Sequence, residues 1–249
     1  MKEREKLKSR LGFILISAGC AIGIGNVWKF PYIAGNGGGG AFVLCYLIFL
    51  VILGLPVMTM EFAVGRASQK SPVKAYQALE KPGQKWHIHG YITVIGCYLL
   101  MMFYTTVSGW MLHYFYLTAT GKFTGLDADQ VGGVFNEMLS QPLVMAFWMI
   151  VVVAIGIFVC SRGLQNGLEK ITKVMMIALL AIMVVLAINS IMMDGAAEGL
   201  KFYLIPDFER MKELGIGYTI VTAMNQAFFT LSLGIGAMAI FGSYIGKER

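Results

Sequence analysis

The sequence predicts an all-α membrane protein with six transmembrane helices. Of its 249 residues, 57% are hydrophobic and 14% are charged, and the mean hydropathy is +0.69, values typical of proteins that cross the membrane several times. The apolar residues gather in segments close to the ~20 residues that a spanning helix requires. The basic residues crowd into alternate connections between these segments, as expected when the chain crosses a bilayer repeatedly.

We expect one transmembrane domain over residues 1–249. Its predicted spans cover about 11–34, 41–64, 88–118, 142–159, 170–192 and 217–244. Lys and Arg are frequent at both chain ends and in the connections after the second and fourth spans. The segments 119–141 and 193–216 are interpreted as polar loops with few bases. The positive-inside rule then places both termini in the cytoplasm and the protein in the plasma or inner membrane.

The connection after the second span contains one predicted helix of its own. Pro72–Leu79 has Pro in its first turn, as a short amphipathic helix lying outside the membrane would. Glu61, just before this connection, lies either at the membrane interface or paired inside the bundle, because an unpaired charge at mid-bilayer is costly. The net charge of +6 follows from membrane orientation, so we expect no nucleic-acid partner.

The first span is interrupted by glycines. Gly19, Gly23 and Gly25 precede Asn26 in its middle, and each glycine weakens a helix by roughly 1 kcal/mol relative to Ala. Non-helical backbone at membrane depth is tolerated only where protein covers it or where it lines a wet cavity. We therefore predict a broken helix whose free carbonyls face a polar site. The alternative is that Gly19-x-x-x-Gly23 is a packing face for a neighbouring helix.

The sixth span repeats this pattern. Gly234-Ile235-Gly236 interrupts it beside the polar side chains of Gln226, Thr230 and Ser232. Two glycine-interrupted spans in corresponding halves indicate the binding site of a transporter. The alternative is that the hydroxyls bond to their own helix and the glycines pack.

Three other side chains, those of Tyr104, His87 and His89, are candidate ligands. Tyr104 lies well inside the third span, where its hydroxyl needs a partner such as a bound carboxylate, or where it is an ordinary aromatic core residue. His87 and His89 could bind a metal, but a solvated pair in a loop is the better interpretation.

Several motifs together resemble the neurotransmitter:sodium symporter family over essentially the whole chain. They are Arg10-Leu11-Gly12-Phe13, the Gly19–Pro31 stretch, Asn36-Gly37-Gly38-Gly39 before Ala41-Phe42, Pro206-Asp207-Phe208, and Phe228–Gly234. The resemblance implies the LeuT-type fold, a well-known example of paired broken helices and inverted repeats. The chain would hold the first inverted repeat and the first helix of the second, with helices 1 and 6 unwound mid-span.

The resemblance also implies two sodium sites, each incomplete in this chain. The carbonyls of Gly19 and Ile22 would serve one site, and Ala21, Asn26 and Thr230 the other, which touches the substrate. Such oxygen donors suit a hard cation. Tyr46 and Gln226 resemble part of the family's chloride site, but chloride dependence stays open.

The substrate implied by the resemblance is a neutral, apolar amino acid. The amides of Ile24 and Gly25 and the hydroxyl of Tyr104 would bind its carboxylate, and Gly23 stands where monoamine carriers place Asp. The other residues implied for the substrate site are Ala21, Leu100, Phe229, Thr230, Ser232 and Ile235.

The gating residues implied by the resemblance are Arg4, Lys29 and Phe229. Lys29 replaces the Arg that bacterial relatives often have in the outer gate, and Lys cannot form the same bidentate pair.

The expected function is therefore sodium-coupled symport of an amino acid, and not catalysis. Family members have eleven or twelve spans, so we expect this chain to be a C-terminally truncated symporter. The alternatives are a half-transporter that pairs with another chain and a non-transporting six-span binding or assembly subunit. A channel is disfavoured, because we find neither a filter motif nor an Arg-rich voltage sensor.

Overall fold

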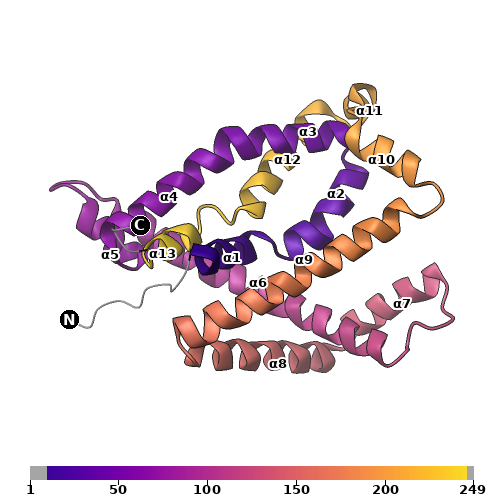
Figure 1. Cartoon of the computed structure of the whole chain (residues 1–249), viewed down its shortest axis with the longest axis horizontal. Coiled ribbons are helices and arrows are strands. Elements are labelled where there is room, and N and C mark those ends of the chain that lie inside the picture. The colour runs from indigo at the N-terminus through magenta and orange to yellow at the C-terminus, as the bar shows by residue number, and fades with distance from the viewer. Residues whose placement is uncertain (1–9, 246–249) are drawn as a thin grey trace. The chain divides into compact units, whose positions relative to one another are not determined.

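The computed structural model describes residues 10–245, and within them every regular element is a helix (Figure 1). One isolated antiparallel bridge joins Gly39 and Pro206. The described chain divides into two compact units. The second unit is Ile95–Leu168, and the first contains the residues before and after it.

The first predicted span contains three helical segments rather than one. Helix α1 (Arg10–Ala21) ends before the π-helix η1 (Gly25–Lys29), which continues into α2 (Phe30–Asn36). Ile22 and Gly23 form a bend between α1 and η1. Pro31 stands in the first turn of α2, where its missing N–H costs nothing.

The second predicted span is a longer helical rod than expected. It consists of α3 (Gly40–Phe49), the π-helix η2 (Leu50–Gly54) and α4 (Leu55–Ser68). The predicted connecting helix is confirmed as α5 (Pro72–Leu79), with Pro72 at its first turn.

The middle of the chain begins with the long helix α6 (His87–Ala119) and continues through α7 (Ala128–Leu139) and α8 (Pro142–Ser161). The prediction that 119–141 is a loop was wrong for α7. The reason is local: the Asp127 carboxylate accepts the Gln130 N–H at 2.8 Å, and the Gln130 side chain accepts the Asp127 N–H at 3.1 Å. This capping box satisfies two N–H groups that otherwise lack partners.

The remaining helices are the π-helix η3 (Leu164–Glu169), α9 (Lys170–Ile191), α10 (Ala196–Leu204), α11 (Phe208–Leu214), α12 (Ile216–Thr230) and α13 (Ala237–Gly242). The prediction that 193–216 is a loop was also wrong, because α10 and α11 lie in it. Asp207 caps α11 by accepting the N–H groups of Glu209 and Arg210 at 3.1 and 3.0 Å.

Four helices in the described chain are long and apolar enough to cross a membrane. They are Gly40–Ser68, His87–Ala119, Pro142–Ser161 and Gly167–Ile191. The first and sixth predicted spans are not among them, because the helices in both segments are interrupted. The six-span arrangement therefore stays a prediction.

In the first unit, α12 and α13 run beside the rod formed by α3 and α4 (Figure 1). The buried core between α3 and α12 includes Phe42, Val43 and Ala223, and Phe30 packs against it. Further along the rod, α4 and α13 approach so closely that a Cβ at Gly65 would overlap the backbone of Ala239. A Cβ at Gly54 would lie 2.6 Å from the Leu231 side chain. The rod thus holds both halves of the interrupted sixth segment.

Candidate functional site

The break between α1 and η1 is closed by the side chain of Asn26. Its Nδ2 donates to the carbonyl of Ala21 at 3.0 Å, which links the end of α1 to the start of η1. The backbone N–H groups of Asn26 and Val27 both donate to the Gly23 carbonyl, at 3.0 and 3.2 Å. The bend is therefore an ordered structure, and Asn26 is the residue that orders it.

The other atom of this amide, Asn26 Oδ1, is buried and has no hydrogen-bond partner within residues 10–245. A buried acceptor without a partner costs about 1–3 kcal/mol. A cation bound at this oxygen would remove that cost. The oxygen also lies on a side chain whose amide contacts the Ala21 carbonyl, so two oxygens predicted to bind sodium come from adjoining positions.

The second interruption is the turn 231–236 between α12 and α13. Ser232 adopts a φ of 52°, in the left-handed region that side chains other than Gly rarely occupy, and Gly234 and Gly236 have φ values of 83° and 69°. The N–H of Ser232 donates to the Phe229 carbonyl at 3.1 Å. A left-handed residue other than Gly carries a cost of order 1–3 kcal/mol, which is characteristic of functional sites.

The two interruptions lie against each other. A Cβ at Gly25 would overlap the aromatic ring of Phe229, so only glycine allows this approach. The Lys29 Nζ stands 4.7 Å from the centroid of the same ring, a cation–π geometry. Gln226 on α12 also donates from Nε2 to the Gly25 carbonyl at 3.1 Å. Gly25 and Lys29, from the Gly19–Pro31 stretch, and Phe229, from the Phe228–Gly234 motif, thus form one cluster.

Thr230, the last residue of α12, connects this cluster to α3. The hydroxyl of Tyr46 donates to Thr230 Oγ1 at 3.2 Å. Both Thr230 and Gln226 are buried, and each has an identified partner, as buried polar groups require. Tyr46 and Gln226 are the two residues resembling part of a chloride site. Tyr46 bonds to Thr230 of the sixth segment, and Gln226, itself on the sixth segment, bonds to Gly25 of the first.

Glu61 on α4 is paired inside the first unit, which was one of its two predicted positions. Its Oε1 accepts the N–H of Gly234 at 2.7 Å, in the middle of the second interruption. Tyr76 on α5, outside the predicted spans, lies close enough to interact with the charge of the same carboxylate. The pKa of its phenol is raised mainly by burial and secondly by the charge of Glu61. The specific role of Glu61 could not be predicted, because its partner is a backbone group 173 residues away.

The packing alternative for the first glycines holds for one of them. A Cβ at Gly19 would lie 3.0 Å from Thr172 and 3.2 Å from Met176, so Gly19 lets α1 approach α9. Nothing lies within 4 Å of a Cβ at Gly23. Gly23 therefore borders open space beside the break, and the packing alternative does not hold for it.

The other predicted site residues are placed as follows. Ser232 and Ile235 lie in the turn between α12 and α13, and Ile24 precedes η1. Leu100 and Tyr104 are on α6 in the second unit, where the Tyr104 ring packs edge-on against Phe103. Arg4 lies outside the described residues.

The comparison with known families decides the identity. The model of the sodium:neurotransmitter symporter family matches residues 4–137 and 130–249. The chain belongs to the sodium:neurotransmitter symporter family. This is a family of transporters, not of enzymes.

Two curated relatives illustrate the range of the family. The uncharacterized sodium-dependent transporter YhdH of Bacillus subtilis is 39% identical over 97% of this chain and 52% of its own length. The sodium-dependent neutral amino acid transporter B(0)AT2 of Rattus norvegicus is 27% identical over 99% of the chain and 37% of its own length. The chain thus spans about half the length, or less, of these relatives.

A solved structure matches the fold as well. The crystal structure of MhsT in complex with L-phenylalanine is 37% identical, with a TM-score of 0.89, over 99% of this chain and 55% of that chain. The helical LeuT-type fold implied by the sequence is therefore shared with this symporter-family structure.

Proposed function

We propose that this chain takes part in sodium-coupled symport of a neutral, apolar amino acid. Its segments 11–34 and 217–244 would be two broken membrane spans in a six-span arrangement with both termini in the cytoplasm. The family is defined by sodium-dependent transporters, which supports the coupling ion. The relatives named for neutral amino acids and the phenylalanine-bound structure support the substrate class.

The observation that carries the proposal is the buried, unpartnered Oδ1 of Asn26 at the break in the first segment. The Ala21 carbonyl accepts from the same amide, and Thr230 Oγ1, which accepts from the Tyr46 hydroxyl, would supply a further oxygen. Neutral and charged oxygens are the ligands that hard cations such as Na⁺ prefer. The second predicted sodium site would use the carbonyls of Gly19, on α1, and Ile22, in the bend.

The amino acid would bind at the same break. Helix η1 begins at Gly25, directly after Ile24. The N–H groups of Ile24 and Gly25 therefore lie at the start of this helix, where the first N–H groups have no acceptor within the helix and carry partial positive charge. These N–H groups would bind the substrate carboxylate, and the open space at Gly23 would admit it.

Phe229, under the Lys29 ammonium, would cover the substrate and release it when the ring moves. The remaining residues proposed to line the pocket are Leu100, Tyr104, Ser232 and Ile235. Arg4 is proposed for the inner gate.

Uptake in proteoliposomes tests the proposal. The chain would be assayed alone and joined to the C-terminal part of its Bacillus subtilis relative, a fusion called here the extended chain. We expect labelled L-phenylalanine uptake by the extended chain under an inward sodium gradient, and background uptake when potassium replaces sodium.

Replacing Asn26 isolates the ion site. In the extended chain, Asn26→Ala should raise the sodium concentration for half-maximal uptake at least tenfold. Thr59→Ala is the matched control, because Thr59 only donates to the Leu55 carbonyl of its own helix at 2.7 Å. Uptake that is equally fast without sodium, or an Asn26→Ala variant with unchanged sodium dependence, would contradict the proposal.

A further inference from the structure

The connection between α4 and α6 has a surface that transport does not use. It contains the four lysines Lys70, Lys74, Lys81 and Lys85, and all four are exposed. Within residues 10–245, none of them belongs to an ion pair. We call this surface the lysine patch.

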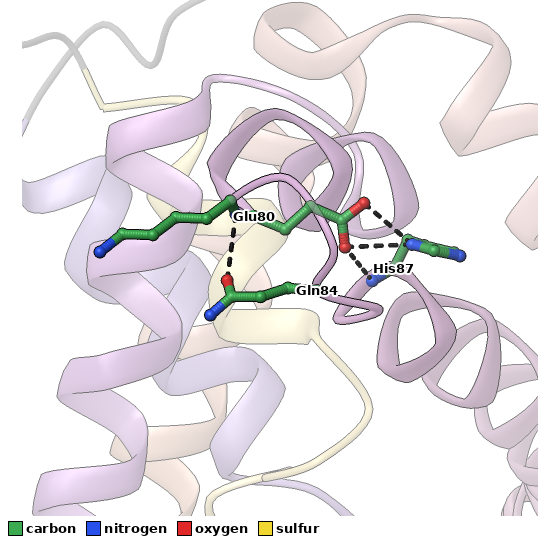
Figure 2. A network of polar contacts seen from close by, with 4 residues as sticks. Glu80, Gln84 and His87 are labelled. Carbon is green, nitrogen blue, oxygen red and sulfur yellow. Dashed lines mark hydrogen bonds and ion pairs between the residues drawn. The ribbon is translucent and has the colours of Figure 1, made fainter.

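The only acid in this connection does not neutralise the patch. The carboxylate of Glu80 accepts the backbone N–H of His87 at 3.0 Å, and His87 Nδ1 lies 2.9 Å from its Oε1. Figure 2 shows the Glu80 carboxylate directed at His87, while the Lys81 backbone N–H donates to Gln84 Oε1 at 3.0 Å. The one carboxylate in this connection is therefore bound to His87 and not to a lysine.

Two large apolar side chains lie exposed beside the lysines. Trp86 is 59% exposed and Leu79 is 45% exposed. Trp is enriched at the membrane–water interface, because its ring is apolar and its N–H is polar. Both residues therefore belong to a surface suited to the boundary of a bilayer.

The fold holds the patch in place. Pro72 and Ala75 form the buried face of α5, and a Cβ at Gly90 would lie 2.7 Å from the Cα of Val73. This close approach fixes α5 against the first turns of α6, so Lys74 projects from a rigid helix. The patch also connects two helices long and apolar enough to cross the membrane, and two such crossings would place it at one membrane surface.

We propose that the lysine patch binds the anionic headgroups of the surrounding bilayer, with Trp86 and Leu79 entering the headgroup layer beside them. The four exposed ammonium groups supply the charge complementarity, and the two apolar side chains select a lipid over a soluble anion. Basic residues at a membrane surface attract anionic lipids within about a Debye length, roughly 10 Å at 0.1 M salt.

Native mass spectrometry of the 249-residue chain in detergent tests this directly. The chain is titrated with phosphatidylglycerol or phosphatidylcholine, and the apparent Kd of the first bound lipid is measured. We expect phosphatidylglycerol to bind at least tenfold more tightly, and inorganic phosphate at equal concentration not to displace it. The patch variant is Lys74→Gln, Lys81→Gln and Lys85→Gln together.

The matched control removes the same charge elsewhere, at the exposed residues Lys122, Lys201 and Lys212, each changed to Gln. Each lysine at an anionic membrane surface raises the binding constant roughly fivefold. Loss of three lysines should therefore weaken phosphatidylglycerol binding by the patch variant about 100-fold, while the control variant should bind within about twofold of wild type. Equal affinity for the two lipids, equal loss in both variants, or displacement by phosphate would overturn the proposal. Transport by the extended chain is a separate measurement, so the two proposals fail independently.

Discussion

The side chain of Asn26 has two roles at the break in the first segment. Its Nδ2 closes the break by binding the Ala21 carbonyl, and this bond fixes the orientation of Oδ1. The buried oxygen then has no hydrogen-bond partner in the described chain. For the sodium site proposed here, this means that the fold orients one ligand in advance, as preorganised sites require.

Gly25 provides a test at the same scale. Replacing Gly25 with Ala would push the Phe229 ring away, because the new Cβ would overlap it. We expect Gly25→Ala to reduce L-phenylalanine uptake by the extended chain at least 20-fold. The Lys29–Phe229 contact would also be disturbed.

Gly35→Ala is the control for this change, since nothing lies within 4 Å of a Cβ there. It should leave uptake within twofold of wild type. Equal uptake by the two variants would mean that the approach of Gly25 to Phe229 is not required for transport.

At the residue level, the sequence was informative where a residue type is unusual for its setting. Gly25, Asn26 and Ser232 attract attention because a glycine weakens a helix and a polar side chain inside an apolar span needs a partner. Their partners could not be predicted, because Gln226 meets Gly25, and Tyr46 meets Thr230, only after distant helices pack. No local pattern encodes such pairs.

Among the elements, the packing of α13 on α4 depends on glycines. A Cβ at Gly65 would overlap the Ala239 carbonyl, and one at Gly242 would lie 2.6 Å from the Phe62 carbonyl. Backbone obstructs both positions, so the helices could accommodate a methyl group only by separating.

We therefore expect Gly65→Ala to destabilise the chain by about 1–3 kcal/mol, the usual cost of overpacking. Gly156→Ala on α8 is the matched control, because nothing lies within 4 Å of a Cβ there. That change should be neutral or stabilise by up to about 1 kcal/mol through helix propensity. Unfolding in detergent followed by circular dichroism measures both, and equal midpoints would contradict the packing argument.

The α5–α6 connection provides a pH test. Desolvation favours the neutral acid, yet the hydrogen bonds and charge of His87 outweigh it, so the pKa of Glu80 lies below its ordinary value. A lowered carboxyl pKa means that the stabilisation is complete above the ordinary Glu pKa of about 4.3 and is lost as the pH falls through the lowered value.

Hydrogen exchange of the peptide covering 81–89, corrected for the intrinsic pH dependence, measures this effect. Protection of the His87 amide should be constant from pH 7 down to about 5 and decrease at lower pH. Glu80→Gln should show reduced protection that no longer changes with pH. Protection that decreases already between pH 7 and 6 would contradict the assignment to Glu80.

The elements were predictable in proportion to their apolar length. The helix Pro72–Leu79 follows from a proline at its first turn, and the long apolar runs mark α6, α8 and α9. Helices α7, α10 and α11 lie in segments predicted to be loops, because a hydropathy pattern does not distinguish a polar helix from a polar loop. The caps Asp127 and Asp207 were the available signal, since each carboxylate accepts the N–H groups of the following turn.

For the molecule as a whole, the apolar spans are sparsely covered by the described chain. The buried share of the apolar window ranges from 22% for Gly40–Ser68 to 0% for Pro142–Ser161. Exposed apolar surface on this scale requires lipid or further protein against it. Helices of this kind are therefore expected to unfold or aggregate in water.

The charge pattern predicts which ends of these helices share a membrane side. His87–Ala119 is long and apolar enough to cross the bilayer once, and such a crossing would place Lys85 and Lys122 on opposite sides. We expect a cysteine at Lys85 to react with a membrane-impermeant maleimide only in inverted vesicles, and a cysteine at Lys122 only in right-side-out cells.

The background for this experiment has the four native cysteines, at positions 20, 45, 97 and 160, changed to Ser. Labelling of both introduced cysteines from one side would reject the predicted orientation of the third span.

The contact between Gly54 and Leu231 has a mechanical consequence. Gly54 ends the π-helical turn of the long rod, and Leu231 opens the turn that divides the sixth segment, so two weak joints lie at one level. On one side of these two interruptions α3 packs against α12, and on the other side α4 packs against α13. A bend at these two points would leave the α3–α12 and α4–α13 packing unchanged, and it would pass next to Phe229 and Thr230, the last two residues of α12.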